Sequence, residues 1–165
     1  TTRRLSLLYK TDSLTGMINR SGFIEKGEAF FETNHRRGKQ MFVVFVKIDS
    51  LKQINDDYGH KTGDRVICDM AHVMNELFSR DAVCARMGGG EFIGIGTFLS
   101  DDDLDDIKDS INTKTIAIEK ARHLPFKLSV SIGSSVVNAS DNESLEHVVK
   151  RANDAMYEEK SKHGH

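Results

Sequence analysis

Short strand-like runs of apolar residues alternate with longer helical stripes along this chain. The run from Met41 to Ile48 is almost wholly apolar and β-branched or aromatic, which predicts a central strand buried on both faces. Two shorter runs, Ala82 to Met87 and Phe92 to Gly96, are joined by a glycine-rich turn, which is typical of a hairpin. Alternation from Phe126 to Val137 predicts a further strand.

Helical stripes fall between and after these strands. Apolar residues recur at helical spacing from Gly63 to Phe78, and the segment from Ser144 to Lys160 is amphipathic. The segment from Asp101 to about Arg122 begins with acidic residues, which suit the positive end of a helix dipole. Phe23 to Phe31 is also predicted to be helical, and Asn34 to Gln40 is predicted to be a loop. The order β-α-β-β-α-β-α predicts an α/β domain with a mixed, mainly antiparallel central sheet flanked by helices.

The start of the chain suggests a domain that belongs to a longer protein. Residues 2–10 read as the end of a helix that breaks near Asp12, so residues 1–11 are predicted to end an upstream linker helix and residues 12–165 to form one domain. A chain of 165 residues with 38% hydrophobic content can bury one substantial core. No apolar run approaches the ~20 residues that span a bilayer, and a signal peptide is not apparent. We expect a cytoplasmic domain, including the case of a cytosolic part of a membrane-anchored protein, with other domains of its parent as partners.

Composition narrows the range of partners and of chemistry. The formal charge is -2, so no basic field favours nucleic acid, and no contact of this domain with a membrane is expected. Cys68 and Cys84 lack CxxC or histidine spacing and are predicted to be buried free thiols. The seven histidines show no metal-ligand spacing.

Four motifs follow one another along the chain. They are Asp12-Ser13-Leu14-Thr15-Gly16 with Asn19-Arg20 and Phe23; Ile48-Asp49-Ser50-Leu51-Lys52-Gln53-Ile54-Asn55-Asp56 with Tyr58-Gly59-His60 and Gly63-Asp64; Arg86-Met87-Gly88-Gly89-Gly90-Glu91-Phe92; and Ser131-Ile132-Gly133 with Ala155-Met156-Tyr157 and Lys160. In this order and over almost the whole chain, they resemble the GGDEF domains of bacterial diguanylate cyclases, which implies the nucleotidyl-cyclase fold. A single motif of this kind would be weak, because glycines in a turn are usually only a turn.

The resemblance implies condensation of two GTP molecules into cyclic di-GMP, each GTP being held by one of two facing domains, and so a homodimer. It also implies two divalent cations such as Mg²⁺, held by the first Asp of a D-I-D triplet, the third hairpin residue and a backbone carbonyl. This chain has Lys47 and Gly90 at the two side-chain positions. An ammonium group ~4 Å from a divalent ion would be repelled by roughly 8 kcal/mol at an effective dielectric of ~20.

These two replacements predict a catalytically inactive domain with no metal site and no cofactor. Glu91 and Asp49 are the only nearby carboxylates for a makeshift ligand set. The family's inhibitory R-x-x-D site for cyclic di-GMP is also predicted to be absent, because Ser79 and Ala82 occupy its positions.

Recognition of guanine is the part that the resemblance leaves in place. Asn55 and Asp64 fall on the family positions that contact the base, where a carboxylate accepts from the N1–H and 2-amino groups. The alternative is that Asn55 only caps a turn and that Asp64 only caps a helix after Gly63.

Phosphate contacts are expected nearby from backbone and lysine. The backbone N–H groups of Ser50, Leu51 and Lys52 lie where the chain turns into a helix, a favourable place for phosphate. Lys160 matches a family lysine that contacts phosphate, and the arginine expected four residues later is Gly164. The nucleotide-binding residues predicted from the resemblance are Asn55, Asp64, Ser50, Leu51, Lys52, Gly88, Gly89 and Lys160.

Three functions are compatible with this sequence. The first is a degenerate GGDEF domain that binds GTP or another guanine nucleotide as a regulatory module, with the ammonium of Lys47 replacing part of the magnesium charge. The second is a ligand-free dimerisation or interaction module. The third is an active diguanylate cyclase with altered metal ligation.

Overall fold

A four-stranded sheet forms the centre of the computed structural model, which describes residues 9–98, 100–138 and 140–162. The strands are β1 (Met41–Ile48), β2 (Ala82–Gly88), β3 (Glu91–Thr97) and β4 (Val130–Val137), in the order β2-β3-β1-β4. All three pairings are antiparallel, and an isolated bridge between Ile18 and Ala85 is parallel. The predicted α/β class and its mainly antiparallel sheet are confirmed.

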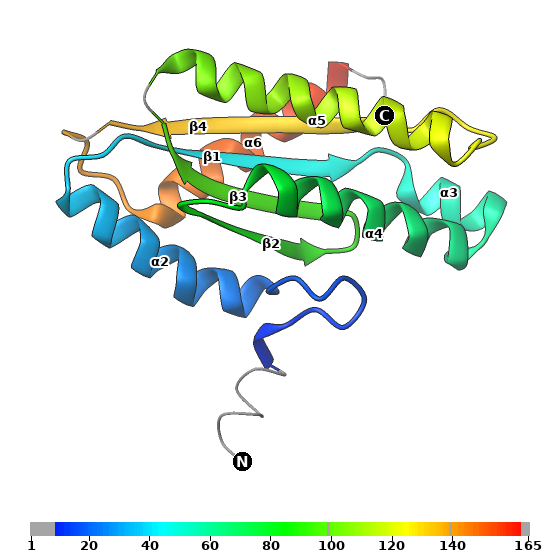
Figure 1. Ribbon diagram of the computed structural model, residues 1–165, viewed down its shortest axis with the longest axis horizontal. Helices are drawn as coiled ribbons and strands as arrows, with labels where there is room; N and C mark the ends of the chain where they lie inside the picture. The colour runs from blue at the N-terminus through cyan, green and yellow to red at the C-terminus, as the bar shows by residue number, and fades with distance from the viewer. Residues whose placement is uncertain (1–8, 99, 139, 163–165) are drawn as a thin grey trace.

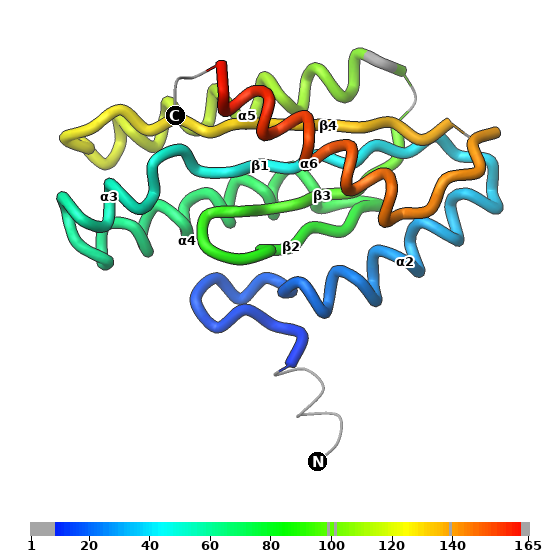
Figure 2. The backbone as a smooth tube through the Cα atoms, turned by 180° about the vertical axis from the view of Figure 1, so that it is seen from behind, coloured from blue at the N-terminus to red at the C-terminus, as the bar shows by residue number. Residues whose placement is uncertain are grey.

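Helices cover both faces of the sheet. Helices α2 (Arg20–Arg36) and α6 (Leu145–Lys162) pack on one face, and α4 (His60–Leu77) and α5 (Asp101–Ala121) on the other, as Figures 1 and 2 show from opposite sides. The short helix α3 (Leu51–Tyr58) follows β1 directly and lies beyond the end of the sheet (Figure 1).

Strand β1 divides the interior into two cores because successive side chains point to opposite faces. Phe42, Val44, Val46 and Ile48 pack towards α4 and α5. Met41, Val43 and Phe45 pack towards α2 and α6. Lys47 continues the second series, so the alternation directs it to the α6 side at the carboxyl end of the strand.

Several predicted boundaries are wrong. The predicted loop from Asn34 to Gln40 begins too early, since α2 continues to Arg36. The Asn34 amide donates to the carbonyl oxygen of Phe30 at 2.8 Å, which holds this last turn in helical form. The fourth strand begins at Val130 and not at Phe126, because its partner β1 ends at Ile48.

Two tight turns decide where the site's helices begin. Ser50 adopts a left-handed conformation (φ 57°) that turns the chain from β1 into α3. Gly59, at φ 91°, separates α3 from α4, so α4 begins at His60 and not at Gly63 as predicted. Only glycine adopts such an angle without strain, which is why a single residue suffices between the helices.

The terminal segments and the two cysteines agree only in part with the predictions. Of the predicted linker helix, Tyr9 and Lys10 are helical and Thr11 instead forms an isolated bridge with Ile18, while residues 1–8 lie outside the described residues, as does Gly164. Both thiols are free as predicted, but each is half-buried and not buried. Burial nevertheless raises the pKa of Cys84 to about 11. Within the described part of the chain, no helix combines the length and apolar character required to cross a membrane.

Candidate functional site

The glycine hairpin between β2 and β3 is fixed by an arginine clamp. Gly88 and Gly89 have φ angles of 146° and 46°, which favour glycine at both positions. The Arg86 guanidinium donates to the carbonyl oxygen of Gly89 at 2.9 Å and to both carboxylate oxygens of Asp12 at 3.0 and 3.1 Å. Burial alone would raise the pKa of Asp12, but hydrogen bonds from Thr15 and the charge of Arg86 outweigh it and lower that pKa. The hairpin is thus tied to the turn that precedes α2.

A cleft of about 430 Å³ opens between this hairpin, the end of β1, the start of α3 and α6. It is lined by Arg20, Lys47, Ile48, Ser50, Leu51, Lys52, Met87, Gly88, Gly89, Gly90, Glu91 and Lys160. Every predicted phosphate-side residue therefore lines one cleft, together with both replaced metal positions. Asn55 and Asp64 do not line it.

Basic side chains dominate this cleft. Arg20, Lys47, Lys52 and Lys160 contribute cations, and Glu91 contributes the one carboxylate. Of these cations, only Lys47 makes an ion pair with another described residue. An excess of unpaired positive charge in a concave site favours an anionic ligand.

The start of α3 adds backbone donors to the same cleft. An α-helix leaves its first N–H groups without intrahelical acceptors, and the Ser50 side chain does not cap them. Leu51 and Lys52 are the first two residues of this helix and both line the cleft. Their N–H groups and the helix dipole act in the same direction as the lysines.

Lys47 is held by two contacts across the sheet and to α6. Its Nζ lies 3.5 Å from a carboxylate oxygen of Glu91, its register partner on β3. It also lies 5.6 Å from the centre of the Tyr157 ring, over which it makes a cation–π contact. The side chains of Lys47 and Glu91 are 26% and 24% exposed, so both reach the cleft from a partly desolvated position.

Gly90 lies where the resemblance implies an acidic side chain, and its surroundings are tight for one. It is buried, and a Cβ added there would lie 3.1 Å from both the Ile48 Cβ and the Leu51 Cδ2. A side chain at this position would therefore require Ile48 and Leu51 to shift by a few tenths of an ångström.

The residues present do not fit a divalent cation. Mg²⁺ requires several oxygen ligands in octahedral geometry. Asp49 is only 3% exposed, and its carboxylate accepts from Ser129 at 2.8 Å and from Ser131 at 2.6 Å, so it does not line the cleft. Over the described ranges no three His, Cys, Asp or Glu side chains gather as a metal-binding group.

The predicted base-binding residues lie further along α3 and at the start of α4. Asn55 is one helical turn after Leu51, roughly 6 Å along the axis. Its Oδ1 is buried without a hydrogen-bond partner among the described residues, so it caps no turn, and a Cβ added to Gly63 would meet that atom at 1.8 Å. Asp64 is exposed and is the fifth residue of α4, so the alternative in which it caps this helix is wrong.

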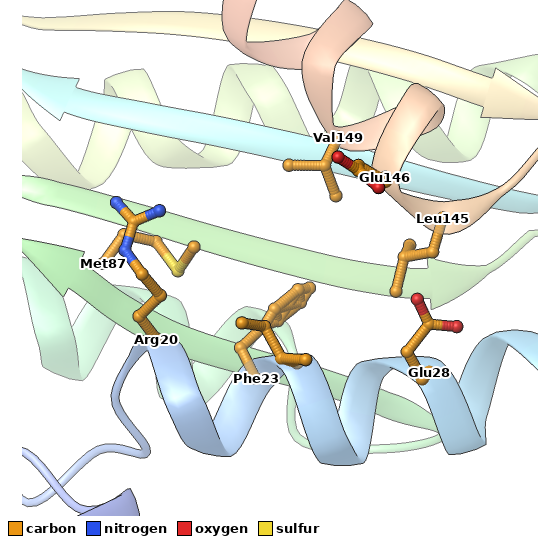
Figure 3. Close-up of a pocket in the computed structure, with 8 residues that line it drawn as sticks. Arg20, Phe23, Glu28, Met87, Leu145, Glu146 and Val149 are labelled. Carbon is orange, nitrogen blue, oxygen red and sulfur yellow. The ribbon is translucent and has the colours of Figure 1, made fainter.

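Arg20 is a site residue that the sequence reasoning missed. In the sequence it stands out only as part of the Asn19-Arg20 motif, without a role. It lines the cleft and also a neighbouring cavity of about 450 Å³ between α2 and α6. Figure 3 shows this cavity, with Arg20 and Met87 at one end and Glu28 and Leu145 at the other. Because Arg20 and Met87 line both spaces, the cavity adjoins the cleft.

Several known proteins are similar to this chain in sequence. A family model described as "Diguanylate cyclase, GGDEF domain" matches residues 9–165. The cyclic di-GMP phosphodiesterase PdeR of Escherichia coli K12 is 30% identical over an alignment of 163 residues that covers 93% of this chain and 23% of PdeR. The diguanylate cyclase DgcP of Pseudomonas aeruginosa is 32% identical over 153 residues, 91% of this chain and 22% of DgcP. The chain thus spans less than a quarter of either relative.

Solved structures agree with the fold. The coiled coil and GGDEF domain of DgcB from Caulobacter crescentus, solved in complex with c-di-GMP, superposes with a TM-score of 0.86 at 25% identity, covering 98% of this chain and 85% of DgcB's. The FimX GGDEF domain from Pseudomonas aeruginosa, at 19% identity and a TM-score of 0.78, shares the fold, covering 93% of this chain and 94% of that one. This chain belongs to the GGDEF domain family of diguanylate cyclases and cyclic di-GMP signalling proteins.

Proposed function

We propose that this GGDEF domain binds GTP or a related guanine nucleotide as a regulatory module and does not synthesise cyclic di-GMP. The phosphates would lie in the basic cleft, against Lys52, Lys160 and the start of α3. The base would lie against Asn55 and Asp64 at the junction of α3 and α4.

The unpartnered Oδ1 of Asn55 carries this proposal. A buried amide oxygen without a hydrogen bond costs stability, roughly 1–3 kcal/mol, and is rare unless a ligand or water completes it. Gly63 leaves this oxygen the space it occupies, since any larger residue would displace it. A polar group kept at a cost favours a ligand-binding role over the interaction-module alternative.

The metal positions support the absence of catalysis. Cyclases of the family normally use Mg²⁺ to neutralise the reacting phosphates. Here Lys47 places a cation where a carboxylate ligand is expected, and Gly90 provides no side-chain ligand at the other position. The makeshift set of Glu91 and Asp49 is not brought together, because Asp49 is turned to Ser129 and Ser131. This weakens the active-cyclase alternative.

Calorimetric titration of the purified domain with GTP and ATP tests the proposal. GTP should bind more tightly, because adenine presents an acceptor at N1 where guanine presents a donor to Asp64. Replacing Asp64 by Ala should weaken GTP binding by about 1.5–3 kcal/mol, the range for hydrogen bonds to charged groups. Asp105, an exposed carboxylate on α5, provides the control, and its Ala variant should bind as the wild type does. Equal affinity for both nucleotides would contradict the proposal.

A further inference from the structure

The charge arrangement of the cleft differs from that of a metal-dependent phosphate site. A metal site presents carboxylates that hold a cation, and the cation then holds phosphate. This cleft presents cations directly, with Lys47 at the replaced ligand position and Arg20, Lys52 and Lys160 around it. A divalent metal ion that entered with the ligand would be repelled by Lys47 and would find few oxygen ligands.

Glu91, whose carboxylate lines the cleft, already forms an ion pair with Lys47. The 3.5 Å between Lys47 and Glu91 exceeds the roughly 2.7–2.9 Å of a tight charge-assisted hydrogen bond. Partly exposed ion pairs of this kind are weak, so a ligand with several charged oxygens can compete for the ammonium group. Tyr157 holds the lysine from the α6 side, which keeps it at the cleft when the carboxylate is displaced.

We infer that the cleft binds a metal-free polyphosphate, with Lys47 in the place of the divalent cation and with Glu91 as a built-in competitor that the phosphate displaces. This inference rests on the proposed function for the identity of the nucleotide. The binding of polyphosphate itself is argued from the residues of the cleft alone. Its consequence is an inverted metal dependence: Mg²⁺ should weaken binding, because it complexes the free triphosphate and brings a cation that Lys47 repels.

Titrations with GTP and with inorganic tripolyphosphate, each in EDTA and in excess Mg²⁺, test this inference on the folded domain. Both probes should bind in EDTA and bind more weakly in Mg²⁺. Lys47→Met removes the charge while keeping an unbranched side chain, and should weaken binding in EDTA by about tenfold or more, the loss expected for one charge-assisted contact. Lys47→Arg should retain most of the affinity.

The variant Glu91→Gln distinguishes two roles of Glu91: a competitor of phosphate for Lys47, or a partner that only holds Lys47 in place. It should tighten binding in EDTA several-fold, because the amide no longer neutralises Lys47. In a Lys47→Met background the same change should have little effect, since the pair that it relieves is already gone. Lys39→Met supplies the matched control: Lys39 is exposed and precedes β1, at the far end of the strand from Lys47, so its loss should leave the affinity unchanged.

The two probes keep the inference distinct from the proposed function. If tripolyphosphate binds in EDTA but GTP is no better than ATP, the guanine assignment fails and the metal-free phosphate site stands. Tighter binding in Mg²⁺, an unchanged or weaker affinity of Glu91→Gln, or no binding of tripolyphosphate in EDTA would each overturn the inference.

Discussion

Gly63 and Asn55 meet so closely that the identity of one residue constrains the other. The Asn55 amide occupies the space above Gly63, where an added Cβ would come within 1.8 Å of its oxygen. The amide oxygen is therefore held by packing and not by hydrogen bonds, because Oδ1 has no partner in the described part of the chain. Under the proposed function, this atom is positioned in advance for the guanine base.

Gly63→Ala tests this arrangement at the residue scale. The added methyl group should displace the Asn55 amide and weaken GTP binding by about tenfold, the loss of one or two good hydrogen bonds. The free energy of unfolding should change little, because alanine gains about 1 kcal/mol of helix propensity that offsets the local crowding. Calorimetry and urea unfolding measure the two effects.

The neighbouring Thr62 supplies the control for this change. It lies in the same turn of α4 and its hydroxyl donates to the Tyr58 carbonyl oxygen, so Thr62→Ala alters the junction without touching Asn55. In an Asn55→Ala background, Gly63→Ala should no longer affect binding. A full effect in that background would show that Gly63 acts by another route.

At the scale of elements, the Asp12–Arg86–Gly89 clamp joins the turn before α2 to the β2–β3 hairpin. Asp12 has a lowered pKa, so its ionised form stabilises the fold. This stabilisation is complete well above the ordinary carboxyl pKa of about 3.9 and is lost as the pH falls through the lower folded-state pKa.

Asp12→Asn should therefore destabilise the domain most at neutral pH. We expect a loss of about 1.5–3 kcal/mol in the free energy of unfolding at pH 7, because Arg86 loses its charged partner. The difference from wild type should narrow below about pH 4, where the wild-type carboxyl group protonates. Urea unfolding across this range measures it. Asp154→Asn, in an exposed pair with Lys150, should cost less than about 1 kcal/mol at any pH.

The elements themselves were predictable to the extent that local pattern decides them. Strand β1 was placed correctly because its apolar run is continuous and buried on both faces. The start of β4 was not placed correctly, because β4 begins where its partner β1 ends. The last pair, Ile48 with Val130, joins residues far apart in the sequence, and β1 ends there because the chain turns at Ser50. The α3–α4 junction was missed because helical periodicity gives no sign of a single-glycine break at Gly59.

The candidate site was predictable where the motifs of the resemblance name residues. The residues expected on the phosphate side do line one cleft. The Lys47–Glu91 pair was not foreseen, since it depends on strand register between β1 and β3. The burial of Asp49 was not foreseen either. It depends on hydrogen bonds from Ser129, just before β4, and Ser131, within β4, which form only in the folded chain.

At the scale of the whole molecule, we expect the replaced metal positions to change what the domain does with GTP. The reaction that the resemblance implies uses two facing domains and metal-bound phosphates, and under the proposed function this domain does not supply the metal ligands, whatever its oligomeric state. We expect no cyclic di-GMP from GTP with Mg²⁺ or Mn²⁺, measured by chromatography of long incubations. A turnover of order 1 per second, typical of enzymes, would contradict this prediction.

Restoring both ligands provides the complementary test. The double variant Lys47→Asp with Gly90→Asp should make GTP binding depend on Mg²⁺, because it removes the repelling ammonium and supplies two carboxylates. Each single variant should fall short, since one retains Lys47 and the other has no ligand at the hairpin. The carboxylate side chain introduced in the hairpin must displace Ile48 and Leu51 by a few tenths of an ångström, so we expect a moderate loss of stability, about 1–3 kcal/mol. Adding Leu51→Ala to the double variant should relieve one of these two contacts and strengthen the Mg²⁺ dependence. If the variants fold but Mg²⁺ still does not promote binding, the metal site was lost through more than these two positions.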